Sequence, residues 1–213
     1  MKIHRLPAIT AAAVVALAAS AYPALAHHPM GGQTPDTLTT GLLSGLGHPV
    51  IGVDHLAFIV AVGIAAAFAG NRLLSPLAFV AATVVGCLLQ VGGIALPAAE
   101  IVIAASILIL GAVVLSGRMI GAPALLGLFA VAGLFHGWAY GTAIVGAEAT
   151  PLLAYLLGFA AVQYAIVVGA GYMVLRIWQA AGPEAIRPRL AGAVVAGVGF
   201  TFLVENLESL IFI

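Results

Sequence analysis

Three side chains that can bind a transition metal lie within eight residues of the sequence. They are His48, Asp54 and His55, in the string HPVIGVDH, and an apolar run over residues 56–69 follows them. Ionisable groups are costly in the hydrocarbon of a bilayer and persist there mainly where they have a partner or a function. One helix that begins near Gly47 would carry both histidines on nearly the same face, about 10 Å apart along its axis. The pattern predicts a protein that handles a metal ion within a membrane, with His48 at the mouth of the span.

Two later apolar segments carry ionisable groups at a similar predicted depth. His136 and Tyr140 are four residues apart in the string FHGWAYG and would share a helix face. Glu205 and Glu208 lie three residues apart near the C-terminus. Counting the helical rise from the segment ends places Asp54, His55, His136 and Glu205 about 11–14 Å from the same membrane surface. We therefore expect one shared metal site. Its predicted ligands are His48, Asp54, His55, His136 and Glu205, and Tyr140 and Glu208 are accessory candidates.

This donor set indicates which metals and which functions to consider. Imidazole and carboxylate ligands suit Ni²⁺, Co²⁺, Zn²⁺ or Cu²⁺, and the sequence has no thiolate pair or methionine cluster that would favour Cu⁺. The single cysteine, Cys87, lies in an apolar stretch and is interpreted as a packing residue. A permease is the first hypothesis. An intramembrane zinc-dependent hydrolase and a haem protein with His55 and His136 as axial ligands are the alternatives.

The composition predicts an all-α membrane protein. Hydrophobic residues make up 63% of the 213 residues, charged residues 7%, and the mean hydropathy is +1.21. Soluble domains carry about 25% charged residues, so this sequence cannot build a water-facing surface, and a net charge of zero argues against a nucleic-acid partner. Continuous apolar segments predict a bundle of six transmembrane helices. The predicted spans are Gly47–Ala69, Leu73–Leu96, Ala98–Leu115, Ala122–Val145, Pro151–Ile177 and Leu190–Ile213.

The first 26 residues have the pattern of a cleavable signal peptide. Lys2 and Arg5 precede a short apolar run, and the small-x-small string ALA ends at Ala26. The predicted organisation is a signal peptide (1–26), an external N-terminal segment (27–46) that is extended as far as about Thr40, and a permease domain (47–213). Cleavage after Ala26 would expose His27 and His28, which could capture metal at the new N-terminus.

The arginines predict the orientation of the spans. The predicted mature chain has no lysine and five arginines, all in or beside the loops that follow the first, third and fifth spans. Lys and Arg accumulate in cytoplasmic loops, so these loops are predicted to be cytoplasmic. The N-terminus and the C-terminus are then external, as are Glu100 and Glu148. The arginines are Arg72, Arg118, Arg176, Arg187 and Arg189.

Two segments carry a family resemblance. HPVIGVDHLAFIVAVG (residues 48–63) and FHGWAYG (residues 135–141) resemble the HupE/UreJ family of nickel and cobalt permeases. The resemblance implies a bacterial inner-membrane permease that takes up Ni²⁺ or Co²⁺ for metalloenzyme assembly, is not an enzyme and holds no permanently bound cofactor. It also implies metal handling by His48, Asp54, His55 and His136. The chain departs from many members at Tyr140, where they have a second histidine, and at Ala143, where a glutamate is common. An oligomer in the membrane is compatible with these patterns.

Overall fold

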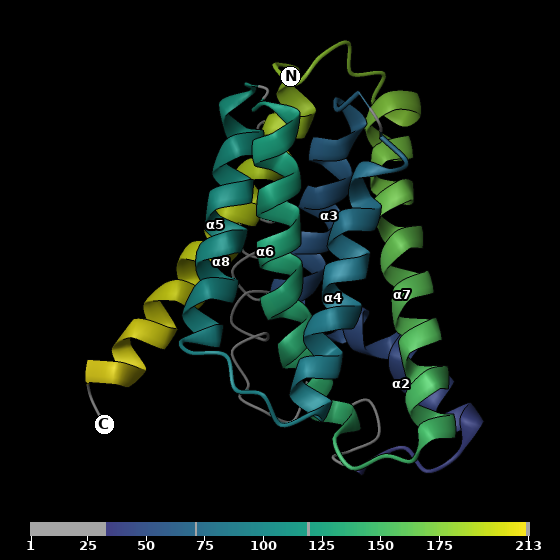
Figure 1. Cartoon of the computed structure of the whole chain (residues 1–213). Helices are drawn as coiled ribbons and strands as arrows, with labels where there is room; N and C mark the ends of the chain where they lie inside the picture. Colours follow the sequence, from purple (N-terminus) through teal and green to yellow (C-terminus); the bar gives the residue numbers. More distant parts are fainter. Residues whose placement is uncertain (1–32, 71, 119, 212–213) are drawn as a thin grey trace, which may run out of the picture.

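The computed structural model describes residues 33–70, 72–118 and 120–211, and this part of the chain is all-helical (Figure 1). The predicted signal peptide and the predicted capture residues His27 and His28 lie outside the described residues. The helices are α2 (Leu38–Ile51), α3 (Val53–Ala67), α4 (Ser75–Val91), α5 (Ala99–Ser116), α6 (Ala122–Gly141), the 3₁₀ turn η2 (Thr142–Ile144), α7 (Ala149–Tyr172), the π-helical turn η3 (Met173–Ile177) and α8 (Ile186–Ile211).

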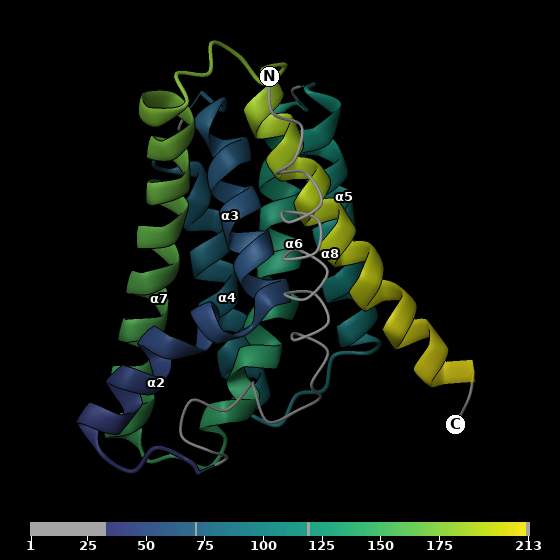
Figure 2. The ribbon, with the colours of Figure 1, turned by 180° about the vertical axis from the view of Figure 1, so that it is seen from behind.

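The helices form a bundle in which three pairs make the most extensive contacts: α4 with α6, α5 with α8, and α2 with α7. Figures 1 and 2 show α3 to α7 running lengthwise beside one another, while α2 crosses at one end of the bundle. The first half of α8 packs along α5 and its second half leaves the bundle at an angle. A core of buried hydrophobic side chains, including Phe58, Phe79 and Phe129, fills the space between α3, α4 and α6.

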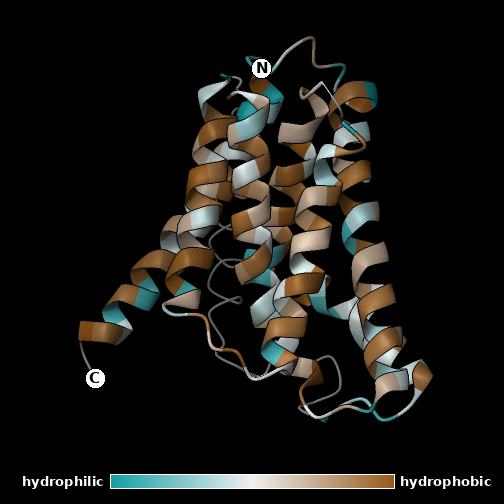
Figure 3. Ribbon diagram, in the orientation of Figure 1, coloured by the Kyte–Doolittle hydropathy of each residue, from teal (hydrophilic) through white to brown (hydrophobic). Residues whose placement is uncertain are grey.

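The prediction of a membrane protein is confirmed, and the number of spans is four to five by length and composition. Four units are long and apolar enough to cross a bilayer: α5, α6 with η2, α7 with η3, and α8. The pair α2 and α3 is a fifth if it counts as one bent span. Hydrophobic residues occur along all the helices of the bundle (Figure 3). Many large ones are exposed on its surface; on α7, for example, Leu153 and Leu157 are 67% and 69% exposed. Such faces suit hydrocarbon and not water.

The second predicted span, Leu73–Leu96, is shorter than expected. Helix α4 has 17 residues, ends at Val91, and is capped by Gly92. Gly93 follows with φ +76°, a left-handed conformation that glycine adopts without steric cost. The consecutive glycines therefore end the helix before the apolar run ends. The third, fourth and fifth predicted spans agree with α5, α6–η2 and α7–η3 to within two residues at each end.

The first predicted span is wrong in shape, because the chain bends by 81° between α2 and α3. Gly52 has an extended backbone (φ −76°, ψ 110°) and is at once the C-cap of α2 and the N-cap of α3. A single helix beginning near Gly47 would hold Pro49 in its first turn. Pro49 instead lies in the last turn of α2, where its missing N–H removes a helical hydrogen bond.

Helix α2 begins at Leu38, so the expected extended segment ends before Thr40. Thr37 and Thr40 cap this start reciprocally through their hydroxyl groups.

Glycines bring α4 and α6 into backbone contact. A Cβ atom at Gly137 would overlap the carbonyl oxygen of Thr83, and one at Gly86 would overlap the carbonyl oxygen of Leu134. On the other side of the bundle, Gly192 and Gly199 let α8 approach the backbone of α5 in the same way. Small residues at such crossings allow van der Waals packing of helices where no water is present to drive association.

We expect Gly137→Ala to destabilise the folded protein by about 3 kcal/mol, the upper end of the usual range, since the added methyl group meets backbone and not a flexible side chain. The matched control is Gly127→Ala on the same helix, where an added Cβ meets nothing within 4 Å. Thermal unfolding of the two variants in detergent checks this expectation. Equal melting temperatures for both variants would contradict the close approach of α4 and α6.

The charged residues are divided between the two ends of the bundle. Helices α3, α5 and α7 end where α4, α6 and α8 begin (Figure 1), and the five arginines all lie in or beside these three connections. Asp36 before α2, Glu100 in the first turn of α5 and Glu148 at the start of α7 belong to the opposite end. The five arginines thus lie at one end of the bundle.

Candidate metal-binding cleft

An acidic cleft opens between α8 and the rest of the bundle, with a volume of about 440 Å³. Three of its lining residues are carboxylates and two are histidines, and no lysine or arginine is found among those that the described chain contributes. A cleft lined by one sign of charge raises the local concentration of the opposite ion. The cleft is therefore suited to collecting cations. Its lining residues are His48, Asp54, His55, Glu100, Ala139, Thr142, Phe202, Glu205, Asn206 and Ser209.

Asp54 and His55 lie in the first turn of α3, and each is 5% exposed. The bend at Gly52 places this turn against the cleft, and the partial positive charge at a helix N-terminus favours a carboxylate there. Oδ2 of Asp54 is 3.8 Å from Nε2 of His55. Oδ1 of Asp54 is buried and has no hydrogen-bond partner in the described part of the chain. A Cβ atom at Gly52 would come within 3.0 Å of the His55 ring and 3.1 Å of this Asp54 oxygen. Glycine at this position therefore leaves room for the side chains of Asp54 and His55.

His136 on α6 lies directly behind His55. Their Nδ1 atoms are 2.9 Å apart, so one ring donates a hydrogen bond to the other. His136 is fully buried, and its opposite face stacks on Phe58 at 4.4 Å between ring centroids. Nε2 of His136 is 3.0 Å from the hydroxyl of Ser106 on α5. The predicted association of His55 with His136 is thus present as a direct contact.

His48, on α2, belongs to a second cluster of polar side chains, which lies beside the pair His55 and His136. The hydroxyl of Tyr155 on α7 is 3.0 Å from Nδ1 of His48 and donates to the carbonyl of Tyr140 at 2.9 Å. The ring of Tyr140 contacts both cleft histidines, with centroids 5.0 Å from His48 and 4.3 Å from His55. Its own hydroxyl is buried without a hydrogen-bond partner in the residues described. Tyr140 therefore separates the two histidines that were expected on one face of one helix.

The remaining predicted residues lie at the edge of the cleft or outside it. Glu205 on α8 lines the cleft but is exposed, whereas Glu208 is exposed and is not part of the lining. Across residues 33–70, 72–118 and 120–211, no three His, Cys, Asp or Glu side chains come close enough to hold one ion together. The candidate site is therefore a pair of histidines with one adjacent carboxylate, and not a closed coordination shell.

The histidine pair does not suit a haem. Axial nitrogens on opposite faces of a haem iron lie about 4 Å apart, twice a metal–nitrogen distance of about 2.0 Å. The 2.9 Å between the Nδ1 atoms of His55 and His136 leaves no room for a porphyrin between their rings.

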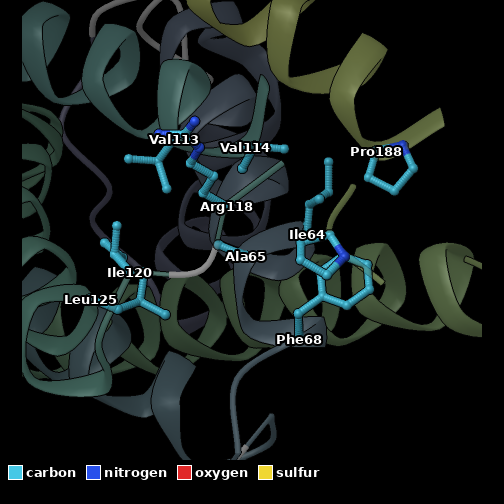
Figure 4. A pocket seen from close by; sticks show the side chains of 10 residues that line it. Ile64, Ala65, Phe68, Val113, Val114, Arg118, Ile120, Leu125 and Pro188 are labelled. Carbon is cyan, nitrogen blue, oxygen red and sulfur yellow. The ribbon is translucent and has the colours of Figure 1, made fainter. Parts of the chain in front are cut away.

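Two other pockets lie near the arginine end of the bundle and contain no metal-binding side chain. One, shown in Figure 4, is an apolar cavity of about 20 Å³ with Arg118 as its charged residue. The other, of about 180 Å³, has Arg72 and Arg176 among otherwise uncharged lining residues. Neither includes His, Asp, Glu or Cys. Of these three pockets, the acidic cleft is thus the candidate for a cation.

Ser106 and Tyr155 are the site residues that sequence reasoning missed. Ser106 is the only polar side chain between Glu100 and Ser116, and this isolation within an apolar span was a signal that could have pointed to it. Tyr155 had no comparable signal, because an aromatic residue in a membrane helix is ordinarily a packing residue. Both are buried at the contact points between helices, which only the fold shows.

Comparison with known proteins gives the family. The family model described as "HupE / UreJ protein" matches residues 11–202. A protein of Rhizobium leguminosarum bv. viciae named "Protein HupE" is 35% identical over 192 residues, which are 88% of this chain and 95% of that protein. No protein of solved structure matches the chain. A match over nearly the whole length, together with a relative at this identity, shows that the chain belongs to the HupE/UreJ family.

Proposed function

We propose that this protein is a permease that takes up Ni²⁺, with Co²⁺ as its second substrate, through the His55–His136 pair. Its family is associated with nickel and cobalt uptake and is a family of transporters rather than enzymes. The observation that carries the proposal for this chain is the 2.9 Å contact between Nδ1 of His55, which lines an acidic cleft, and Nδ1 of His136, which is buried behind it.

The spacing of the two nitrogens suits one metal ion. Two nitrogen ligands that each lie about 2.1 Å from a metal, at right angles to one another, are about 3.0 Å apart. An ion can therefore replace the shared hydrogen bond without the two Nδ1 atoms moving apart, once each ring rotates so that its lone pair points at the ion instead of at the other nitrogen. Before the ion can bind both rings, whichever Nδ1 atom carries the proton of the shared hydrogen bond has to release that proton. If that atom belongs to His55, a proton can return to its Nε2, where Oδ2 of Asp54 at 3.8 Å is the available acceptor.

The proposed path begins in the cleft and proceeds in three steps. Glu100 and Glu205 attract the cation, and His48 meets it on the α2 side of the cleft. Asp54 and His55 then bind it at the floor, and His136 shares it with His55. Few donors and a site that is not closed favour release, since a permease that binds its ion too tightly cannot pass it on.

On the far side of His136 the path is closed by aromatic side chains. Phe58 stacks on the His136 ring, and Phe79 contacts Phe58 at 5.5 Å between centroids. Both are fully buried in the core. The described conformation thus corresponds to a state that is open toward the acidic end and shut toward the arginine end, and release requires these two rings to separate.

We further propose that the chain crosses the bacterial inner membrane six times. Helix α4, with 17 residues, is about 26 Å long, close to the hydrocarbon thickness of about 30 Å, and it packs along α6. With the bent α2–α3 pair as one span, six crossings put all five arginines on the cytoplasmic side. The cleft and the C-terminus then face outward, as does the N-terminal segment whose His27 and His28 could present metal to it.

Uptake should depend on pH, and this tests histidine ligation. Only the deprotonated imidazole nitrogen binds metal, so uptake of radioactive nickel into cells that lack their own importers should fall as the pH is lowered from about 7.5 to about 5.5. Competition by unlabelled cobalt in the same cells ranks the two metals. Constant uptake over this range would contradict ligation by histidine.

A further inference from the structure

We propose that Ser106 is a positioning residue that fixes the tautomer of His136, so that Nδ1 of this ring carries the lone pair for the metal ion. The proposal rests on the proposed function for its consequence in transport. The tautomer itself is a property of the protein alone and can be measured without a metal.

The argument begins with the single proton of the Ser106 hydroxyl. The hydroxyl lies 2.7 Å from the carbonyl oxygen of Ile103 and 3.0 Å from Nε2 of His136. A carbonyl oxygen can only accept, so the hydroxyl proton is directed to Ile103. The Ser106 oxygen is then an acceptor toward His136, and Nε2 of His136 is the atom that donates to it.

The second step follows from the chemistry of a neutral imidazole, which carries one N–H and one lone pair. With the proton on Nε2, the lone pair of His136 lies on Nδ1, the atom that faces His55. Nδ1 of His55 therefore donates across the 2.9 Å contact in the metal-free state. One consistent arrangement of protons results, running from His55 through His136 and Ser106 to the carbonyl of Ile103.

Burial makes this arrangement costly to reverse. His136 is fully buried and Ser106 is 5% exposed, so water cannot readily replace the serine as a partner. In the other tautomer, Nε2 would become an acceptor facing a hydroxyl whose proton is engaged with Ile103, and a buried polar atom without a hydrogen bond is destabilising. Ligating histidines commonly donate their second N–H to a neighbouring acceptor that orients the ring. Ser106 occupies that position here.

A similar arrangement occurs at His48. The hydroxyl of Tyr155 donates to the carbonyl of Tyr140 and therefore accepts from Nδ1 of His48. The two buried hydroxyls belong to different helices and contact different histidines, which allows each to be removed without the other.

The test is nitrogen-15 NMR of protein labelled at histidine, with the His136 signals identified by their loss in His136→Gln. Wild-type His136 should show a protonated Nε2 and an unprotonated Nδ1. Ser106→Ala should give a mixture of the two tautomers. Ser106→Thr, which retains the hydroxyl, should restore the wild-type signals.

Ser116→Ala is the matched control. The hydroxyl of Ser116 also donates to a carbonyl three residues earlier on α5, at 2.7 Å, but it does not contact a histidine. Tyr155→Phe should alter the His48 signals and leave those of His136 unchanged.

In transport, Ser106→Ala should raise the nickel concentration needed for half-maximal uptake by about 10- to 100-fold, the usual effect of losing such a partner. Ser106→Thr should bring this concentration most of the way back to the wild-type value.

A protonated Nδ1 on wild-type His136 would overturn the proposal whether or not any variant folds. Unchanged His136 signals in Ser106→Ala would also overturn it. If the NMR results are as expected but wild-type protein takes up no nickel, the tautomer assignment stands and the proposed function fails.

Discussion

His136→Gln is expected to reduce nickel uptake by about 100-fold or more, to the background of cells without the protein. His136 is the fully buried member of the histidine pair, and in the proposed path the ion passes from His55 to this residue. Glutamine keeps polar atoms at the site but does not supply an imidazole nitrogen. Loss of a neighbouring orienting group alone typically costs 10- to 100-fold, so loss of the ligand itself should reach at least the upper end of that range.

His55→Gln should have the same effect, and the double variant should be no worse than either single variant, because two residues that hold one ion act as a unit. Uptake is measured per amount of membrane-inserted protein. The matched control is Cys87→Ala, which removes a fully buried side chain near Tyr140 that can also bind metals but does not line the cleft. It should retain wild-type uptake. A folded His136→Gln protein with half of the wild-type rate would show that the ion does not pass through the histidine pair.

Asp54→Asn is expected to lower uptake by about 10- to 100-fold. Asp54 is the one buried carboxylate of the cleft, and Oδ1 has no hydrogen-bond partner among the described residues, which leaves it available to a cation. Its Oδ2, 3.8 Å from Nε2 of His55, is also the proposed acceptor for a proton on that nitrogen when Nδ1 binds the ion. Asparagine has nearly the same shape, so the change removes the charge and not the packing.

Glu205→Gln is the comparison that separates a ligand from a charge that merely attracts. Glu205 lines the same cleft but is exposed, and water and salt screen its field. Its replacement should lower uptake by no more than about threefold at low salt, with no difference at about 0.5 M salt. Equal losses in the Asp54 and Glu205 variants, with the same salt dependence, would indicate that Asp54 contributes only to the overall field.

The sequence predicted the helices best where one physical signal dominates. The units α5, α6–η2 and α7–η3 are long apolar segments, and their limits were predicted to within two residues. The second span was predicted too long because hydropathy does not register the left-handed Gly93 that ends the helix. The bend at Gly52 was missed because proline near the start of an apolar run also fits the first turn of a helix. The threonine capping pair at Thr37 and Thr40, which marks the true start of α2, does not contain the glutamate or glutamine typical of a capping box.

The sequence indicated only in part which of the candidate side chains contact one another. Helical rise alone placed Asp54, His55 and His136 at one depth, and His55 and His136 are in contact. The rotation of each helix about its axis depends on side-chain packing with its neighbours, which a single sequence does not specify. For that reason the separation of His48 from His55 by Tyr140, and the roles of Ser106 and Tyr155, emerge only from the fold.

The most direct test of a nickel path through His55 and His136 uses the purified protein alone. Liposomes that contain the protein and a metal-sensitive dye receive external nickel under an imposed membrane potential, negative inside, and the rate of dye response is recorded. Wild-type protein should give nickel entry well above protein-free liposomes, and His55→Gln and His136→Gln should each abolish it. Entry at the wild-type rate in both variants, or no entry of nickel or cobalt with correctly inserted wild-type protein, would contradict the account.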